Sequence, residues 1–434
     1  MTDWRRTVAT GGRRRAVLTV SIAGSLVLAA CSGNAGGGSD ADPAATSTAP
    51  LTAPPTATAP ATTTEPPTTA PPATSTPVTD AASTVPDATV QRRYDFAAVG
   101  PIVEATIEEH DLDGAALVVV QRDDGVVHEQ YWGDFAPDRV SLIASSSKMV
   151  VAGVLLRLAD QGLIDLDAPV ADAVEWGSGN PAITPAQLVS NSSGLVGLGP
   201  NPGYPPYVCQ FLPSGTLQDC ASSIFTTTGD DADVIAPDTE FRYGGAQWQV
   251  AGAVAEAVTG RSWAELIDET YVEPCGVDSL GFNNHWAQIG AGFDYPAAFA
   301  ADPSTLDATE NPNLEGGAYV APPDYAHLLL MLLREGRCDD TQVLSPAAVE
   351  RMLADRIGEV YGGSDIDGNG YGLGWFVDRS TGRRTDPGAY GSVAWLDVDA
   401  GHGAFLLIEG TGGVGNDLAK ALFDPVADAV ADAR

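Results

Sequence analysis

The chain has 434 residues, of which 57 are acidic and 22 are lysine or arginine, so its formal net charge is −35 at pH 7. A surface with such an excess of negative charge repels phosphate groups, and we therefore expect no nucleic-acid partner. The length suits one large folded domain or two.

The first 31 residues are typical of a targeting segment rather than of a folded domain. Arginines between Arg5 and Arg15 precede an apolar run, 16–30, that is too short for a stable membrane span. The run ends in Leu28-Ala29-Ala30-Cys31, which resembles a bacterial lipobox. This resemblance implies cleavage before Cys31, lipid attachment to its thiol and a lipid-anchored protein outside the cytoplasm. The alternative is an ordinary signal peptide, and both the general secretory and the twin-arginine routes stay open.

Residues 32–90 consist mainly of Ala, Thr, Pro, Ser and Gly and contain no lysine or arginine. Such a composition cannot bury a core, so it predicts a disordered stalk. The folded domain is expected to span residues 91–434.

Within this domain, strand patterns lie at both ends and helical patterns lie between them. Helical spacing predicts helices over 96–107, 150–158, 247–259, 263–271, 324–334 and 418–430, the last with Pro425 as a kink. Alternating or β-rich runs predict strands over 115–121, 126–132, 371–377, 389–396 and 403–408. The expected fold is α/β (α+β): an antiparallel sheet formed by both ends of the domain, flanked by helices, with a mostly helical insertion.

Ser145 and Lys148 are the first candidate catalytic residues. Lys148 follows Ser145 by three positions at the start of the apolar helix, so the two side chains should share one helix face. A serine hydroxyl is a weak nucleophile unless a base takes its proton, and a lysine in an apolar pocket can assist that transfer. The alternative is that Ser145 only caps the helix.

The cysteines of the expected domain are Cys209, Cys220, Cys275 and Cys338, an even number in an exported chain, which predicts two disulfides. The short loop favours Cys209 with Cys220 and leaves Cys275 with Cys338, although three pairings are open. Residues 365–370 copy the first half of a calcium loop, but Phe376 stands where the loop needs a glutamate. We therefore expect neither a metal nor another cofactor.

Four stretches together resemble the serine β-lactamase-related family, which includes class C β-lactamases, D-alanyl-D-alanine carboxypeptidases and esterases of the penicillin-binding-protein type. They are the Ser145 and Lys148 pair, 183–195, 241–245 and 371–375. The resemblance implies that Ser145 forms an acyl-enzyme, that Lys148 keeps the site poised, and that Tyr243 shuttles the proton. The backbone N–H groups of Ser145 and of Ala389, which follows Gly388, are expected to form the oxyanion hole.

Two positions depart from the family pattern. The second motif commonly reads Tyr-x-Asn, but Gly245 stands in place of the asparagine that binds the amide side chain of a substrate. The third motif usually begins with lysine or histidine, but here it reads Asp386-Pro387-Gly388, and His402 lies too late in the chain to restore the cation. The pocket should therefore suit an uncharged ester better than a carboxylated peptide.

Three functions follow from these observations. The first is a membrane-anchored serine hydrolase that acts on an ester or a small amide. The second is a D-alanyl-D-alanine carboxypeptidase or β-lactamase that acts on cell-wall peptides or β-lactams. The third is a catalytically silent member of the fold that binds cell-wall material.

Overall fold

The computed structural model describes residues 92–198, 204–226, 233–289, 295–296, 302–360 and 368–433. The expected targeting segment with Cys31, the expected stalk, and the first three residues of the calcium-like loop, 365–367, lie outside these residues. No helix within the described ranges is both long and apolar enough to cross a membrane.

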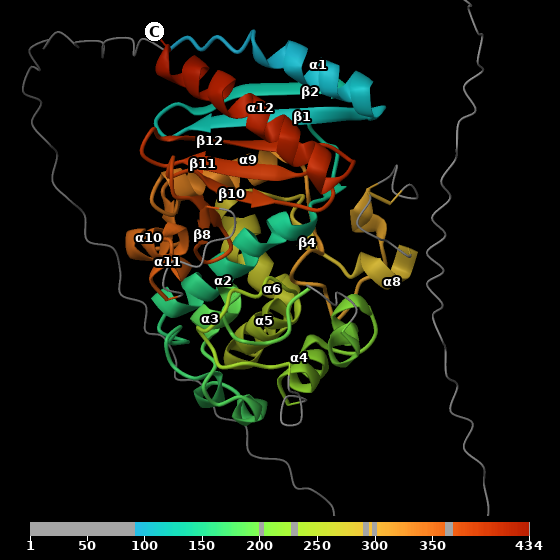
Figure 1. Cartoon of the computed structure of the whole chain (residues 1–434), viewed down its shortest axis with the longest axis vertical. Helices are drawn as coiled ribbons and strands as arrows, with labels where there is room; N and C mark the ends of the chain where they lie inside the picture. Colours follow the sequence, from blue (N-terminus) through green and yellow to red (C-terminus); the bar gives the residue numbers. More distant parts are fainter. Residues whose placement is uncertain are drawn as a thin grey trace, which may run out of the picture. The chain divides into compact units, whose positions relative to one another are not determined.

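A seven-stranded antiparallel sheet forms the centre of the described domain, in the order β2-β1-β12-β11-β10-β9-β8 (Figure 1). Strand β1 pairs with β12 so that Ala116 lies opposite Leu407, which joins the two ends of the domain. The expected sheet built from both chain ends is therefore confirmed. Its strands are β1 (Gly114–Gln121), β2 (Gly125–Gly133), β8 (Asn369–Tyr371), β9 (Phe376–Asp378), β10 (Arg384–Pro387), β11 (Val393–Asp397) and β12 (His402–Leu407).

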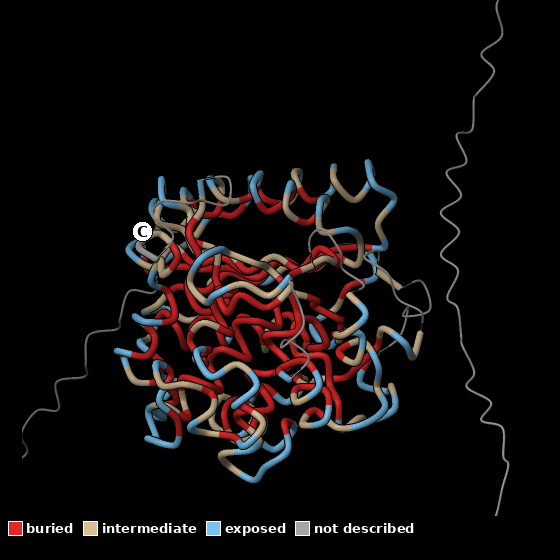
Figure 2. Tube along the Cα trace, turned by 60° about the horizontal axis from the view of Figure 1, so that its bottom comes forward, coloured by how far each residue is buried: buried red, intermediate tan, exposed pale blue. Residues whose placement is uncertain are grey.

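Both faces of strand β1 are buried. Leu117 and Val119 of β1 pack under helices α1 (Val99–His110) and α12 (Gly412–Ala431), whereas Ala116 and Val118 face the second and larger core. Because successive side chains of a strand point to opposite faces, burial of both faces explains why β1 is apolar without alternation. Figure 2 shows the buried backbone running through the interior of the domain.

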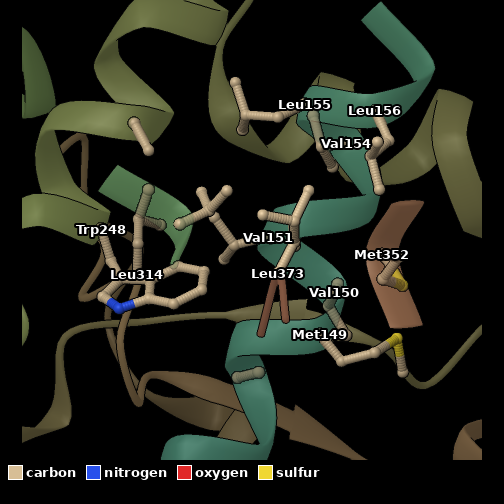
Figure 3. Close-up of a cluster of buried hydrophobic side chains, with 14 of the residues drawn as sticks. Met149, Val150, Val151, Val154, Leu155, Leu156, Trp248, Leu314, Met352 and Leu373 are labelled. Atoms are coloured by element: carbon tan, nitrogen blue, oxygen red, sulfur yellow. The ribbon is translucent and has the colours of Figure 1, made fainter. Parts of the chain in front are cut away.

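Helices of the insertion and α9 (Pro322–Leu333) form the larger core. Helix α2 (Ser147–Asp160) lies in its middle, and Figure 3 shows its apolar side chains against Trp248, Leu314, Met352 and Leu373. A helix that is apolar nearly all round is buried nearly all round, as the sequence predicts. The other α-helices are α3 (Pro185–Val189), α4 (Leu217–Thr226), α5 (Ala246–Thr259), α6 (Trp263–Ile267), α7 (Glu273–Cys275), α8 (His285–Ile289), α10 (Pro346–Leu353) and α11 (Ile357–Val360).

A small sheet of order β3-β5-β4 leads into α2. Leu142 of β3 lies opposite Tyr319 of β5, and the Ile143 N–H donates to the Ala318 carbonyl oxygen at 3.0 Å. This sheet therefore fixes the chain just before Ser145. Its strands are β3 (Ser141–Leu142), β4 (Gly281–Phe282) and β5 (Ala318–Val320). A separate hairpin consists of β6 (Arg337–Cys338) and β7 (Thr341–Gln342).

Two of the expected strands have the wrong bounds. The strand expected at 371–377 is a hairpin, because Gly374 adopts a φ of +86° between β8 and β9. The strand expected at 389–396 begins only at Val393 and follows β10, a polar strand that apolar patterning does not reveal. The expected helices at 263–271 and 418–430 are present. The first passes from α6 into a π-helical turn, Asp268–Val272, and the second is part of α12, which runs through Pro425.

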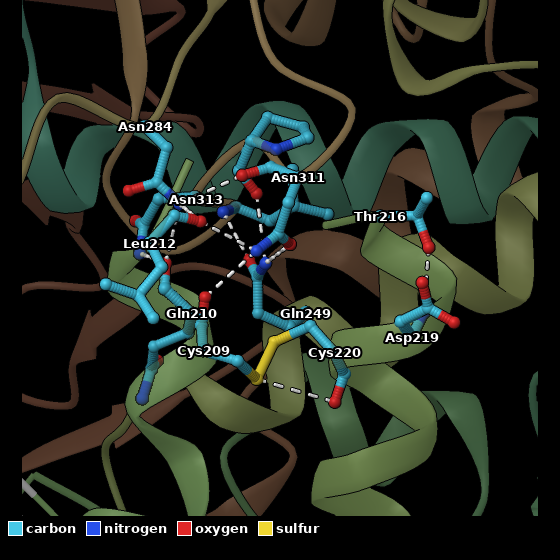
Figure 4. Close-up of a disulfide and its surroundings, with 12 residues drawn as sticks. Cys209, Gln210, Leu212, Thr216, Asp219, Cys220, Gln249, Asn284, Asn311 and Asn313 are labelled. Atoms are coloured by element: carbon cyan, nitrogen blue, oxygen red, sulfur yellow. Dashed lines mark hydrogen bonds between the residues drawn. A yellow bond between two sulfur atoms is a disulfide. The ribbon is translucent and has the colours of Figure 1, made fainter. Parts of the chain in front are cut away.

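Both expected disulfides are present. Cys209 is bonded to Cys220, next to a group of buried amide side chains (Figure 4), and Cys275 is bonded to Cys338. The first bond joins the segment Pro205–Phe211 to α4, and the second joins α7 to β6.

Candidate active site

Ser145 lies in a short 3-10 turn, Ala144–Ser146, between β3 and α2. Ala144 has a φ of +45°, a left-handed conformation that is strained for a residue with a side chain. Hydrogen bonds hold this turn: Ser146 Oγ donates to the Asp386 carbonyl oxygen at 2.7 Å, and Ser392 Oγ donates to the Ile143 carbonyl oxygen at 2.7 Å. Between positions 141 and 150, Ser145 alone is partly exposed, so its side chain is the one that a substrate can reach.

The ammonium group of Lys148 lies directly beside the Ser145 hydroxyl. Lys148 Nζ donates to Ser145 Oγ at 3.1 Å and to the Glu315 carbonyl oxygen at 2.9 Å. Its side chain is fully buried, and its nearest carboxylate oxygen is Glu315 Oε2 at 3.9 Å. A cation buried in this way needs such partners, because an isolated charge is strongly disfavoured in a protein interior.

Tyr243 lies over the same ammonium group. Lys148 Nζ is 4.6 Å from the centre of the Tyr243 ring, which also packs against Tyr371 and Phe376. Burial raises the pKa of the Tyr243 phenol, whereas the Lys148 charge and hydrogen bonds with Ser145 and Lys148 lower it. The structure thus brings Ser145, Lys148 and Tyr243 together, as a proton transfer between them requires.

Gly388 and Ala389 lie in the turn after β10, not on a strand as expected. A Cβ at Gly388 would be 2.2 Å from the Ile143 carbonyl oxygen, so the absence of a side chain lets this turn approach the residues that precede Ser145. Ala389 packs against the small cluster that contains Ala144. Among the described residues, neither the Ser145 N–H nor the Ala389 N–H donates to another backbone group. Both donors are available for an oxyanion.

Asp386 occupies the position where the family pattern has a cation. Its side chain is 1% exposed, and Oδ2 accepts a hydrogen bond from the Met149 N–H at 3.3 Å. Burial raises the pKa of this carboxyl well above its ordinary value, although the Lys148 charge opposes the shift. His402 lies on β12, 3.1 Å from the Asp397 carboxylate, so it does not supply the missing cation.

Glu315 is a member of this group that the sequence analysis does not single out. It precedes β5 and is 167 positions from Lys148, so no local pattern connects the two. The only signal is its setting, since it is the one charged residue between Glu310 and Asp324. Burial raises the pKa of its carboxyl, and the Lys148 charge lowers it.

Gly245, the other departure from the family pattern, starts helix α5 two residues after Tyr243. It has no side chain to offer to a substrate. The carboxyl group of Glu315 and the amide group of Gln210 fill the adjacent space.

A cavity lies apart from this group, and a metal site is absent from the described residues. A cavity of about 850 Å³ opens beside α6 and the segment 303–312, and neither Ser145, Lys148 nor Tyr243 lines it. In the described part of the chain, no three His, Cys, Asp or Glu side chains gather closely enough to hold a metal ion.

The arrangement around Ser145 contains the parts that acyl transfer needs. A partly exposed hydroxyl lies within hydrogen-bond distance of a buried ammonium group and beside a phenol. Two backbone donors flank the same turn. Such a group can activate a hydroxyl for attack on a carbonyl carbon and stabilise the oxyanion that results.

Comparison with known proteins agrees with this geometry. The family described as Beta-lactamase matches residues 99–427. Penicillin-binding protein 4 of Amycolatopsis lactamdurans is 24% identical over 76% of this chain and 89% of its own length. The 6-aminohexanoate-dimer hydrolase of Paenarthrobacter ureafaciens is 26% identical over 72% of this chain and 79% of its own length. The structure of EstCE1, a hydrolase with promiscuous acyltransferase activity, superposes with a TM-score of 0.61 at 20% identity and covers 77% of this chain and 98% of its own.

Proposed function

We propose that this chain, which belongs to the β-lactamase family of serine hydrolases, cleaves an ester or a small amide through an acyl-enzyme on Ser145. The observation that carries the proposal is the 3.1 Å contact between Lys148 Nζ and Ser145 Oγ, with the Tyr243 ring over the same ammonium group. Three groups from two segments of the chain meet there at the one exposed point of a buried turn.

In the proposed reaction, Tyr243 reacts in its ionised form, and its phenolate oxygen accepts the Ser145 proton while Oγ attacks the carbonyl carbon of the substrate. The backbone N–H groups of Ser145 and Ala389 donate to the oxyanion. Tyr243 then returns the proton to the leaving oxygen or nitrogen, and the bond to the leaving group breaks. In the second half, the Tyr243 phenolate accepts a proton from water as the water oxygen attacks the acyl-enzyme carbonyl. Tyr243 then gives that proton to Ser145 Oγ, the bond between the acyl carbon and Oγ breaks, and the carboxylic acid product leaves.

The charges near the site support an ester rather than a peptide that ends in a carboxylate. Asp386 replaces the cation of the third motif with a buried carboxyl. A carboxylated substrate would therefore find no cation from this motif. An uncharged ester does not need one.

A second candidate function is cleavage of D-alanyl-D-alanine peptides or β-lactams. The specific observation in its favour is the likeness to a penicillin-binding protein over 89% of that relative's length. A penicillin-type probe separates the two candidates, because stable labelling of Ser145 would favour the wall-directed enzyme.

A fluorophosphonate probe, read by intact mass, tests the proposed nucleophile. We expect one adduct on the wild-type chain, none on Ser145→Ala, and an unchanged adduct on Ser178→Ala, which removes an exposed serine outside the site. Adduct formation on Ser145→Ala would refute the assignment. Absence of any adduct on the wild-type chain would support the silent, wall-binding alternative.

We also propose that the chain is exported and anchored to the membrane by a lipid on Cys31. Support comes from the lipobox-like run that ends at Cys31 and from the two disulfides of the domain, because disulfides persist in oxidising compartments. Metabolic labelling with a fatty acid in a bacterial host should mark the wild-type chain and leave Cys31→Ala unlabelled. Equal labelling of both chains would exclude the anchor.

A further inference from the structure

Two polar side chains from distant segments meet beside Gly245. A Cβ at Gly245 would lie 2.1 Å from Gln210 Oε1 and 2.2 Å from Glu315 Oε1, and real Cβ atoms do not approach other atoms so closely. This is the position where the family pattern has the asparagine of its second motif. The carboxyl group of Glu315 therefore stands in the space that an asparagine side chain would enter.

Buried amide side chains hold both segments in place. Asn313 Nδ2 donates to the Gln210 carbonyl oxygen at 2.9 Å (Figure 4). Gln249 Oε1 accepts from the Leu314 N–H at 2.7 Å. Both bonds are buried, so moving either segment would leave polar groups without partners. Glu315, the next residue after Leu314, is thus held in a fixed position.

Glu315 contacts Lys148 at two points. Its carbonyl oxygen accepts from Lys148 Nζ at 2.9 Å, and its Oε2 atom lies 3.9 Å from the same nitrogen. The side chains are 7% and 0% exposed, so little water separates the charges. Lys148 Nζ also donates to Ser145 Oγ. The position in which Glu315 holds the ammonium group therefore also determines its hydrogen bond with Ser145.

We propose that Glu315 is a positioning residue for the acylation step and that Gly245 and Glu315 form a matched pair. The missing side chain at 245 admits the Glu315 carboxyl, and that carboxyl fixes the Lys148 ammonium group against Ser145. The Glu315 carboxyl thus occupies the space of the asparagine side chain of the second motif, and from there it holds Lys148. This inference rests on the proposed serine-hydrolase function.

A set of four full-length proteins tests the matched pair: wild type, Gly245→Asn, Glu315→Ala, and the double variant. Gly245→Asn should lower the Tm by about 2–10 °C and slow fluorophosphonate labelling at least tenfold, because two side chains compete for one space. In the double variant the asparagine takes the space that Glu315 leaves, so the losses in Tm and in labelling rate should be smaller than the sum of the losses in the two single variants. Losses in the double variant that equal this sum would refute the pairing.

Gly260→Asn is the matched control. Gly260 ends α5 with a φ of +69°, which asparagine tolerates, and among the described residues no neighbouring atom lies within 4 Å of the point that a Cβ would occupy there. The same substitution at the other end of the same helix should leave both Tm and labelling near the wild-type values.

Glu315→Gln separates positioning from packing, since it keeps the shape and removes the charge. We expect a Tm within about 3 °C of wild type, labelling that is about 10- to 100-fold slower, and an acidic limb of the pH–rate profile that moves to lower pH. The limb moves in this direction because a negative charge close to the site disfavours proton loss from the Tyr243 phenol. Asp386 faces the same lysine and is unchanged in this variant. Glu315→Asp, which keeps the charge, should restore part of the rate.

Labelling of Glu315→Gln at the wild-type rate with an unchanged pH profile would reduce Glu315 to a packing residue and overturn the inference. A wild-type chain that does not react at all would instead refute the proposed function. In that case the Tm values of the four proteins still decide whether Gly245 and Glu315 share one space.

Discussion

The carboxyl group of Asp386 binds the first turn of the helix that carries Lys148: its Oδ2 atom accepts a hydrogen bond from the Met149 N–H at 3.3 Å. The N–H groups of a first helical turn have no partner within the helix, so an acceptor there is favourable. Asp386 thus holds the start of α2, while its backbone carbonyl oxygen holds the Ser145 turn through Ser146. The residue at the start of the third motif thus supports the Ser145 turn and supplies no cation.

Asp386→Asn should stabilise the protein at neutral pH. Because burial raises the pKa of Asp386 in the folded state, the folded chain keeps a proton that the unfolded chain releases above about pH 3.8. The wild-type chain therefore loses stability as the pH rises from about 4 toward the raised pKa, and asparagine, which keeps the acceptor, does not. Thermal unfolding should show a Tm advantage for Asp386→Asn at pH 7 that shrinks toward pH 4. A constant difference across this range would contradict the assignment of the proton.

Lys148→Met and Tyr243→Phe should each slow acylation by about 10²–10⁴-fold, because the first removes the ammonium group that contacts Ser145 Oγ and the Tyr243 ring and the second removes the proton acceptor. The pH dependence separates the two roles. Acylation by the wild-type chain should rise with pH, because burial raises the pKa of the Tyr243 phenol and the fraction present as the proton-accepting phenolate increases with pH. Tyr243→Phe should flatten this rise. A Tyr243→Phe profile with the same slope as wild type would move the base function to another residue.

The sequence alone predicts the contact between Ser145 and Lys148, the two candidate catalytic residues that lie nearest each other in the chain. Ser145 and Lys148 are three positions apart at a helix start, and helical geometry alone puts them on one face. Burial of α2 follows from its apolar composition in the same local way. These predictions need no knowledge of the remaining chain.

Glu315 and the polar strand β10 show where local patterns fail. Glu315 reaches Lys148 across 167 positions, through a segment that buried asparagines and a glutamine hold in place. Strand β10 contains Arg384 and Asp386 and has no apolar alternation, so its structure depends on pairing with Val393 and its neighbours in β11. Both features arise from tertiary contacts that a single sequence does not display.

Gly388→Ala should impair the proposed oxyanion hole. The added methyl would lie 2.2 Å from the Ile143 carbonyl oxygen and 2.3 Å from Ser392 Oγ, so the turn that carries Ala389 has to move away from Ser145. Loss of one oxyanion donor slows acyl transfer by about 10²–10³-fold. The control is Gly413→Ala in the first turn of α12, where the nearest atom would be 3.9 Å away. Ester-hydrolysis rates that fall equally in both variants would contradict a specific role for Gly388.

The two disulfides should differ in what their removal changes. Cys275→Ala/Cys338→Ala opens a loop of 63 positions and should reduce the free energy of unfolding by about 4 kcal/mol, with little change in acylation because neither residue touches the site. Cys209→Ala/Cys220→Ala opens a loop of only 11 positions, so it should reduce the free energy of unfolding by less, about 3 kcal/mol.

The Cys209–Cys220 bond also lies next to the site, because Cys209 precedes Gln210, whose side chain lies against the space beside Gly245. Removing this bond should therefore slow fluorophosphonate labelling more than removing the other, although it destabilises the fold less. Denaturant unfolding and labelling rates on the two double variants measure both effects, and equal labelling by the two would show that the Cys209–Cys220 bond serves stability alone.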